Sequence, residues 1–189
     1  MSQAKVLNEH ELKRVLSVVS QDRYAARNRV ALALSFYAGL RVGEIASLKL
    51  RDVVDRDGHV RDEIRLLAGY TKGKQARTAF VNRRLHKELQ RYVAGLPNNV
   101  SHDRALLLTQ KGAAFSPNTL CQLFSQIYAR AGVDGASSHS GRRWFITQLA
   151  HKGTSAKVIM TLAGHKHLST TQRYIEVNDQ MMREAVETL

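Results

Sequence analysis

The sequence predicts a mainly helical α+β domain with one small antiparallel sheet. Apolar residues recur at helical spacing through most of the 189-residue chain, which predicts amphipathic helices. A single stretch, residues 59–81, has instead the composition of short strands. With two prolines, no internal repeat and no low-complexity run, the chain offers no boundary between domains. We therefore expect one domain over residues 1–189, with residues 1–6 flexible and residues 178–189 forming a C-terminal tail.

Helices are expected to open the chain. Residues 7–12 combine an N-cap pattern with an acidic first turn, and carboxylates are favourable at a helix N-terminus. Gly39 is expected to end the second helix, because glycine is a frequent helix stop. The expected helices cover Leu12–Val19, Arg23–Tyr37 and Val42–Leu50, and a charged turn follows over Arg51–Gly58.

The strands are expected next. His59–Arg61 and Ile64–Ala68 have strand-like composition, and so does Thr78–Val81. Between them, Thr71–Gln75 has the composition of a hairpin turn and carries two lysines. These segments would form the small antiparallel sheet.

The C-terminal half is expected to be helical again. Ser116 followed by Pro117 predicts an N-cap with proline in the first helical position. Gly164 predicts a helix end. The expected helices cover Leu85–Leu96, Pro117–Ala131, Gly141–His151, Ser155–Leu162 and Thr170–Val177, and the tail places Met181, Met182, Ala185 and Val186 at helical spacing.

Charge and composition limit the kind of function. The formal net charge is +13 and the pI is about 10.3, which in a folded domain indicates nucleic acid or another anionic surface as partner. No apolar run approaches the roughly 18 residues that a membrane span needs, and no signal-peptide pattern opens the chain. The single cysteine, Cys121, excludes an internal disulfide and fits a reducing compartment such as the cytoplasm. Cys121 lies in an apolar helical pattern, so we expect it to be buried rather than nucleophilic.

The residues best able to do chemistry lie in one stretch without acids. Between Gly135 and Ile175 there is no Asp or Glu, whereas there are six Lys/Arg and four His, so an anionic ligand is expected there. His139 and Arg142 are three residues apart and would project from one face of a helix. His165 follows a predicted helix end. Tyr174 comes nine residues later, far enough for its phenol to turn back toward the first pair.

These residues, in this order and at these spacings, resemble the catalytic domain of the tyrosine recombinase (phage integrase) family. The His-x-x-Arg box of the family corresponds to His139–Arg142, and its Gly-His motif corresponds to Gly164–His165. Its nucleophile corresponds to Tyr174, and Ser169–Arg173 also resembles the segment that precedes this tyrosine.

The earlier motifs of the family have counterparts upstream. Its first arginine box resembles Ala38–Ile45, where Arg41 would contact the scissile phosphate and Glu44 would hold catalytic side chains in place. Its hairpin lysine corresponds to Lys72, in a Lys-Gly-x-x-x-Arg pattern that Arg77 completes. The resemblance implies six catalytic residues, namely Arg41, Lys72, His139, Arg142, His165 and Tyr174. Basic residues around them are expected to contact DNA, namely Lys74, Arg77, Arg143, Lys166, His167 and Arg173.

The resemblance also implies an activity and its partners. Tyr174 would cleave one DNA strand, form a 3′-phosphotyrosyl link and release a 5′-hydroxyl, and the link would then be rejoined to another 5′-hydroxyl. This is site-specific recombination, with integration, excision or inversion as the outcome. It implies double-stranded DNA as substrate, a homotetramer on paired sites with contacts through the tail, an accessory DNA-binding protein, and a cytoplasmic location at the nucleoid. Neither a metal nor another cofactor is implied.

The chemistry of the side chains agrees with these roles. A phenol has a pKa near 10 and attacks poorly while protonated. Arg41 and Arg142 can make bidentate contacts to the non-bridging oxygens of a phosphodiester, and His139 and His165 can exchange protons. A lysine on the hairpin can protonate the leaving oxygen. Lys74 competes with Lys72 for that role, because the sequence does not fix the hairpin register.

Each of these residues also has a simpler interpretation, and the whole pattern fits two rival functions. Taken singly, an arginine is usually solvated, a histidine after a glycine usually caps a helix, and a tyrosine is usually core. A zinc site of His139, His165 and His167 is not expected, since residues two apart on a helix diverge and no Cys or acidic cluster completes it. The rival functions are DNA relaxation by a type IB topoisomerase and non-catalytic DNA-binding regulation on the same fold.

The chain is shorter than the family pattern at its N-terminus. Typical members carry a helical core-binding domain before the catalytic domain, whereas only a few residues precede the first helix expected here. We expect either a naturally short recombinase or an isolated catalytic domain, and the Met1–Ser2 start favours the former.

Overall fold

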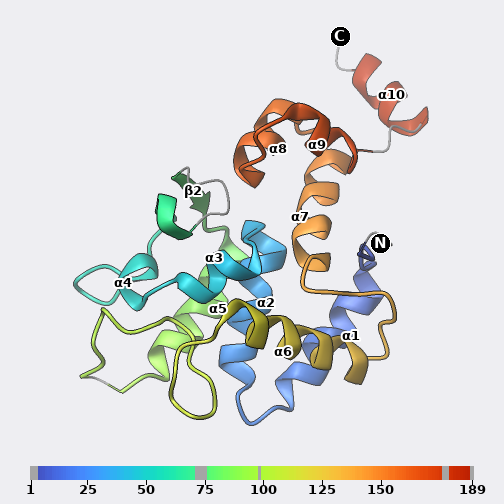
Figure 1. Ribbon diagram of the computed structural model, residues 1–189. Coiled ribbons are helices and arrows are strands. Elements are labelled where there is room, and N and C mark those ends of the chain that lie inside the picture. The colour runs from blue at the N-terminus through green and yellow to red at the C-terminus, as the bar shows by residue number, and fades with distance from the viewer. Residues whose placement is uncertain (1–3, 71–75, 98, 176–178, 188–189) are drawn as a thin grey trace.

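Helix α2 (Ala25–Ala38) lies at the centre of the fold. After its polar first turns it has no single apolar stripe, because its residues from Val30 to Phe36 are buried without a break. Such a helix needs partners on several sides, and α1 (Glu9–Ser20), α5 (Arg83–Ala94) and α7 (Ser140–His151) pack against it (Figure 1). The computed structural model describes residues 4–70, 76–97, 99–175 and 179–187.

The described residues are mainly helical with one small antiparallel sheet, which confirms the predicted fold class. None of the helices in these ranges combines the length and apolarity needed to cross a bilayer. The remaining elements are α3 (Val42–Ser47), α4 (Leu50–Val53), β1 (Glu63–Leu66), the 3-10 turn η1 (Ala68–Tyr70), β2 (Arg77–Phe80), α6 (Pro117–Arg130), α8 (Ala156–Ala163), α9 (Leu168–Gln172) and α10 (Asp179–Val186).

Several helix ends lie where the sequence predicts them. The Asn8 side chain accepts from the Glu11 N–H at 2.9 Å and the Glu11 carboxylate accepts from the Asn8 N–H at 3.0 Å, so a capping box opens α1. Ser116 caps α6 in the same position. Gly39 and Gly164 end α2 and α8 in the left-handed region, as expected of helix-stop glycines.

The sheet is smaller than predicted. Strands β1 and β2 pair antiparallel with Ile64 opposite Ala79, and side chains along β1 alternate between buried and exposed. The predicted strand His59–Arg61 is wrong. The Asp55 carboxylate accepts from the backbone N–H groups of Asp57 and His59, and this tight turn leaves only an isolated bridge at residue 60. The predicted hairpin turn, residues 71–75, lies outside the described residues.

Two helix boundaries also differ from expectation. The helix predicted over Val42–Leu50 ends at Ser47, because the backbone is extended at Leu48. A short helix, α4, then forms where a charged turn was expected, since its apolar residues at 50 and 53 lie one helical turn apart and are both buried. The helix predicted over Thr170–Val177 is α9, which ends at residue 172, and residues 176–178 lie outside the described ranges.

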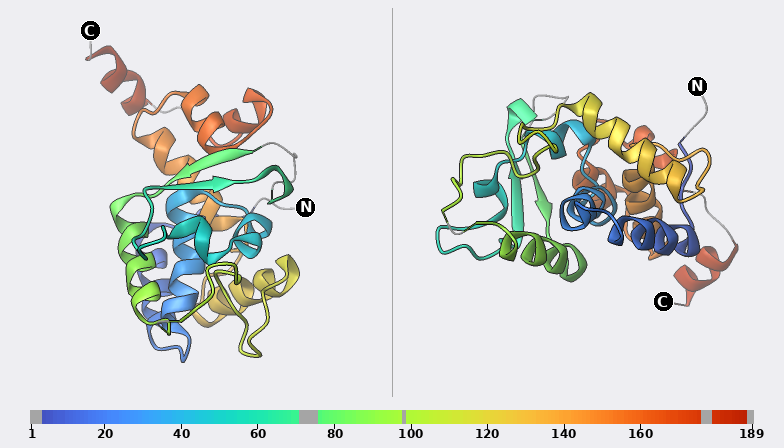
Figure 2. Two further views of the ribbon diagram at one scale, coloured as in Figure 1. Left: turned by 90° about the vertical axis from the view of Figure 1, so that its left-hand side faces the viewer. Right: turned by 90° about the horizontal axis from the view of Figure 1, so that it is seen from below.

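Helix α7 connects the main core to a second, smaller one. Figure 1 shows it running from the lower helices to the α8–α9 pair. Its residues Ile146 and Ala150 pack with Ile159 and Ala163 of α8, and Tyr174 packs against this cluster. The segment that contains Tyr174 therefore packs against α7, the helix that begins at the His139–Arg142 box. Helix α10 stands apart from the rest of the molecule (Figures 1 and 2).

Candidate active site

Five of the six residues predicted as catalytic line one pocket. They come from the start of α3, the start of α7 and the segment from the end of α8 to just after α9, which are far apart in the sequence. The sixth residue, Lys72, and its competitor Lys74 lie outside the described residues. The pocket has a volume of about 390 Å³ and is lined by Ala4, Arg41, His139, Arg142, Arg143, His165, Thr170 and Tyr174.

A reversal of the chain between α2 and α3 brings Arg41 to the pocket. Gly39 ends α2 with a φ of 63°, a conformation that favours glycine. A Cβ on Gly39 would lie 2.5 Å from the ring of Phe145, so α7 passes directly against this turn. Leu40 is fully buried, and the next residue, Arg41, is the N-cap of α3 and faces the pocket.

Three arginines from three elements hold the C-terminus of α8. The last carbonyls of a helix lack partners within it and carry partial negative charge, so guanidinium groups are favourable there. His165 follows these carbonyls directly, so its position depends on the same contacts. We call the three side chains the arginine cap. The donor–acceptor pairs are Arg77 with the Leu162 carbonyl (2.8 Å), Arg142 with the Ala163 carbonyl, and Arg41 with the Gly164 carbonyl (3.2 Å).

Glu44 joins two members of the arginine cap. Its side chain is only 1% exposed. The carboxylate accepts from the backbone N–H of Arg41 at 2.8 Å and its guanidinium at 3.0 Å, and from Arg77 at 2.7 and 3.4 Å. Burial by itself would raise the pKa of Glu44, but the charge and hydrogen bonds of Arg77, followed by those of Arg41, hold that pKa below its usual value. Glu44 is therefore ionised at neutral pH.

Arg142 is a buried cation. It is 6% exposed and donates to the Gly39 carbonyl at 2.6 Å, and no carboxylate in the described ranges forms an ion pair with it. Burial, followed by the like charges of Arg41 and Arg77, lowers the pKa of Arg142 to about 9, which leaves it charged at pH 7. A buried charge without a counter-ion is unfavourable. An anion that entered the pocket would relieve this cost.

His165 is neutral at pH 7 and lies beside Tyr174. Burial, followed by the charges of Arg142 and Arg41, lowers the pKa of His165 to about 4. Its Nδ1 shares a hydrogen bond of 2.9 Å with the Thr171 hydroxyl, which leaves Nε2 for other partners. The His165 and Tyr174 rings are nearly parallel, 21° apart, with their centroids at 5.9 Å.

Arg143 also contacts Tyr174. Its guanidinium carbon lies 5.2 Å from the centroid of the Tyr174 ring, within the range of a cation–π interaction. Its Nε is buried and has no hydrogen-bond partner in the part of the chain that the structure describes. The sequence pattern assigns Arg143 to DNA contact, and the structure places its guanidinium against the Tyr174 ring, at the pocket itself.

The other basic residues expected to contact DNA fall into two groups. Lys166, His167 and Arg173 are exposed near the pocket, at the start of α9 and just after it. Arg77 differs from expectation, because its side chain is only 9% exposed and its guanidinium is engaged by Glu44 and the end of α8. The assignment of DNA contacts and catalytic roles stays a prediction.

Two features of the site were not found from the sequence. Thr171 is fully buried and holds His165, six residues earlier in the chain. Gly141, inside the His139–Arg142 box, touches α2, since a Cβ there would lie 2.5 Å from the Ser35 hydroxyl oxygen. A glycine between two expected site residues is the signal that would have indicated close helix packing.

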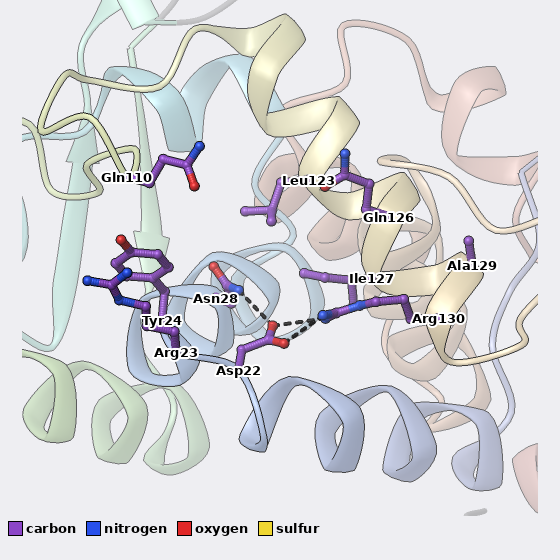
Figure 3. Close-up of a pocket in the computed structure, with 10 residues that line it drawn as sticks. All are labelled: Asp22, Arg23, Tyr24, Asn28, Gln110, Leu123, Gln126, Ile127, Ala129 and Arg130. Atoms are coloured by element: carbon purple, nitrogen blue, oxygen red, sulfur yellow. Dashed lines mark hydrogen bonds and ion pairs between the residues drawn. The ribbon is translucent and has the colours of Figure 1, made fainter.

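A larger pocket lies elsewhere, between the α1–α2 turn and α6 (Figure 3). It has a volume of about 540 Å³. Its one carboxylate is already paired, because Arg130 donates twice to Asp22 at 2.7 and 2.9 Å and Asn28 donates to it as well, and the third ionic group, Arg23, lies over the Tyr24 ring. The smaller pocket is the better candidate, since Arg142 there is a buried charge with no ion-pair partner among the described residues, whereas Arg23 is exposed to solvent.

Comparison with known proteins identifies the family to which this chain belongs. The phage integrase family model matches residues 5–181, so the chain belongs to the phage integrase family. The tyrosine recombinase XerA of Pyrococcus horikoshii is 30% identical over 183 residues, which cover 97% of this chain and 60% of that protein. The tyrosine recombinase XerC of Staphylococcus carnosus is 29% identical, covering 93% of this chain and 58% of the relative. The chain thus spans about three fifths of the length of these relatives.

Solved structures agree on the fold. A crystal structure of XerA recombinase superposes with a TM-score of 0.75 at 23% identity, covering 100% of this chain and 64% of that one. The XerH site-specific recombinase bound to difH substrate superposes with a TM-score of 0.69 at 26% identity, covering 96% and 53%.

Proposed function

We propose that this protein cleaves and rejoins DNA as a site-specific tyrosine recombinase, with Tyr174 as nucleophile. The observation that carries the proposal is that Tyr174 shares one pocket with Arg41, Arg142, His139 and His165. Cationic and neutral hydrogen-bond donors around a phenol suit attack on a phosphodiester. The names of the relatives, tyrosine recombinases XerA and XerC, support this class of reaction.

The proposed reaction conserves the phosphodiester bond. The Tyr174 oxygen attacks phosphorus, the bond from phosphorus to the 5′-oxygen breaks, and the leaving oxygen takes a proton. The enzyme then holds a 3′-phosphotyrosyl link, which the 5′-hydroxyl of another strand attacks in the reverse sense. Each step exchanges one P–O bond for another.

The arginines are proposed to stabilise the transition state. Arg41 and Arg142 reach the pocket from α3 and α7. Each donates part of its N–H groups to backbone carbonyls, Arg41 to Gly164 and Arg142 to Gly39. Their remaining N–H groups are available for the non-bridging oxygens of the scissile phosphate. Because these groups are fixed before DNA arrives, little reorganisation accompanies the reaction.

The histidines are proposed to handle protons. With its pKa near 4, His165 is a neutral imidazole at pH 7 and can donate a hydrogen bond to the phosphate through Nε2. A phosphate bound beside the arginines would raise this pKa, which would let His165 accept the proton of the phenol. Its Nδ1 is held by Thr171, which fixes the ring. His139, the N-cap residue of α7, is exposed at the pocket and is proposed to contact the phosphate.

The test is covalent trapping on a nicked suicide duplex, in which the cleaved 5′ end diffuses away. Wild-type protein should form a band of protein joined to DNA on a denaturing gel, and Tyr174→Phe should bind DNA but form no such band. A shifted band with Tyr174→Phe would remove Tyr174 from the role. DNA binding without any adduct by wild-type protein would favour a regulator, and supercoil relaxation without recombinant product would favour a topoisomerase.

The leaving-group acid is proposed to be Lys72, on the family pattern alone. Lys72→Ala should cleave a normal substrate slowly and a 5′-bridging phosphorothioate at nearly the wild-type rate, because a sulfur leaving group needs no proton. Rescue of Lys74→Ala instead would assign the role to Lys74.

We also propose that protomers assemble on paired DNA sites, as a homotetramer, through the tail of residues 178–189. Helix α10 stands apart, and its Met182 and Val186 side chains are 52% and 67% exposed. An amphipathic helix with exposed apolar residues gains stability by packing against another surface.

A further inference from the structure

Arg77 faces inward although the sequence pattern assigns it to DNA contact. It is the first residue of β2, and its side chain is 9% exposed. All three of its guanidinium nitrogens donate hydrogen bonds within the protein, two to Glu44 and one to the Leu162 carbonyl. A guanidinium used in this way has little capacity left for a phosphate.

The stem of Arg77 is as closely packed as its head. A Cβ placed on Gly164 would lie 2.5 Å from Cδ of Arg77 and 3.0 Å from its Nε. The arginine therefore lies against the turn that follows α8, directly before His165. Only a residue without a side chain leaves room for it there, and the φ of 61° at Gly164 independently favours glycine.

We propose that Arg77 is a positioning residue of the active site, which holds Glu44 against Arg41 and fixes the end of α8 that presents His165. This proposal rests on the recombinase function proposed above. Two of the four hydrogen bonds that Glu44 accepts come from Arg77. Without them, Glu44 keeps Arg41 as its only ion-pair partner in the described ranges, and α8 loses one of its three capping cations.

The positioning role and a DNA-contact role predict different measurements. A residue that neutralises a DNA phosphate contributes about 0.9 to the slope of log affinity against log salt. A residue that only positions catalytic groups leaves this slope unchanged but lowers the rate of cleavage when DNA is saturating. A displacement of about 1 Å at reacting groups lowers a rate on the order of 100-fold.

The experiment measures both quantities for Arg77→Met and Arg77→Lys. We expect the affinity of Arg77→Met for a half-site duplex to lie within about twofold of wild type. Its slope of log affinity against log salt should equal that of wild type, because no contacted phosphate, worth about 0.9 each, is lost. Its covalent adduct should form on the order of 100-fold more slowly on saturating suicide duplex. Arg77→Lys keeps the charge but loses the planar fork, so its rate should fall by roughly tenfold.

Two matched variants serve as controls. Arg91→Met makes the same chemical change at an exposed arginine whose ion pair with Glu88 is 3.6 Å long, and it should alter neither quantity. Lys166→Ala removes an exposed residue expected to contact DNA, and it should lower the salt slope by about 0.9.

The inference is overturned if Arg77→Met cleaves saturating DNA within threefold of wild type, or if its salt slope falls as that of Lys166→Ala does. Should Arg77→Met fail to fold, Arg77→Lys keeps a positive charge beside the buried Glu44 and decides by its cleavage rate alone, since its salt slope would be unchanged in either role. Cleavage of saturating DNA by Arg77→Lys within threefold of wild type would then overturn the inference. A wild-type protein that forms no adduct would instead refute the proposed function, so the two failures are distinct.

Discussion

Gly141→Ala should damage the active site through a single methyl group. Gly141 lies in the first turn of α7, where this helix crosses α2. The added Cβ would lie 2.5 Å from Oγ and 2.9 Å from Cβ of Ser35, and 2.8 Å from Cδ2 of Phe36. Ordinary contacts begin near 3.4 Å, so the two helices would have to separate by about 0.5 Å if the Ser35 hydroxyl rotates away and by about 0.9 Å if it does not. Arg142 is the next residue and would move with the helix.

The magnitudes follow from that displacement. Overpacking of a core costs roughly 1–3 kcal/mol, and alanine gains at most about 1 kcal/mol over glycine in a helix. We therefore expect a net destabilisation of about 1 kcal/mol, or a Tm lower by about 2–4 °C. The effect on cleavage should be larger, roughly 10- to 100-fold, because Arg142 is displaced by about 0.5–0.9 Å. The assays are thermal unfolding and the rate of adduct formation on saturating suicide duplex.

Two further variants isolate the cause. Ser35→Gly combined with Gly141→Ala removes two of the three close contacts and should restore most of the cleavage rate. Gly43→Ala adds a methyl group in α3 where nothing lies within 4 Å, so it should leave the rate unchanged. Cleavage by Gly141→Ala within threefold of wild type, with an unchanged Tm, would refute the reasoning that the α2–α7 crossing sets the site.

Two other predictions concern acid stability and assembly. The pKa of His165 is about 4 in the folded protein and near 6.5 when unfolded, so the unfolded chain binds more protons between these values and stability should fall as pH falls from 6.5 to 4. This pKa shift corresponds to about 3 kcal/mol of unfolding free energy, which partial exposure to solvent reduces to roughly 1–2 kcal/mol. Between pH 6.5 and 4, the unfolding free energy of His165→Asn, measured in urea, should therefore fall by about 1–2 kcal/mol less than that of wild type. Removing residues 178–189 should leave binding of one protomer nearly intact but abolish cooperative complexes on a duplex with two half-sites, in gel shifts between about 50 and 200 mM salt. Unchanged cooperativity in the shortened protein would contradict the assembly proposal.

The sequence predicted those parts of the site that depend on local pattern. The spacing of His139, Arg142, His165 and Tyr174 along the chain was enough to expect that these side chains converge, and the resemblance to the tyrosine recombinase family added Arg41 to them. The inward turn of Arg77 could not be predicted in this way. Its burial depends on partners 33 and 85 residues away in the chain, and a basic hairpin gives the same pattern whether its arginine faces DNA or the core.

The secondary structure, like the site, was predicted where a local sequence pattern determines it and missed where distant or competing contacts do. Long amphipathic helices were predicted within a few residues, since their apolar spacing repeats over several turns. The short helix α4 was missed, because its two apolar residues give no period. The predicted strand at residues 59–61 failed since the carboxylate of Asp55 competes for the backbone N–H groups that a ladder would use.

The arginine cap has a consequence for how this site tolerates sequence change. All three guanidinium groups bind main-chain carbonyls at the end of α8, and every residue type supplies a carbonyl. Substitution of the half-buried Leu162 therefore leaves the acceptor for Arg77 in place, provided that the helix persists. Gly164 has no such freedom, because Arg77 fills the space that a side chain would need. The arginines are thus held by backbone atoms, so the side chains at the end of α8 can change without loss of these hydrogen bonds. The glycine at position 164 is constrained, because any side chain there would collide with Arg77.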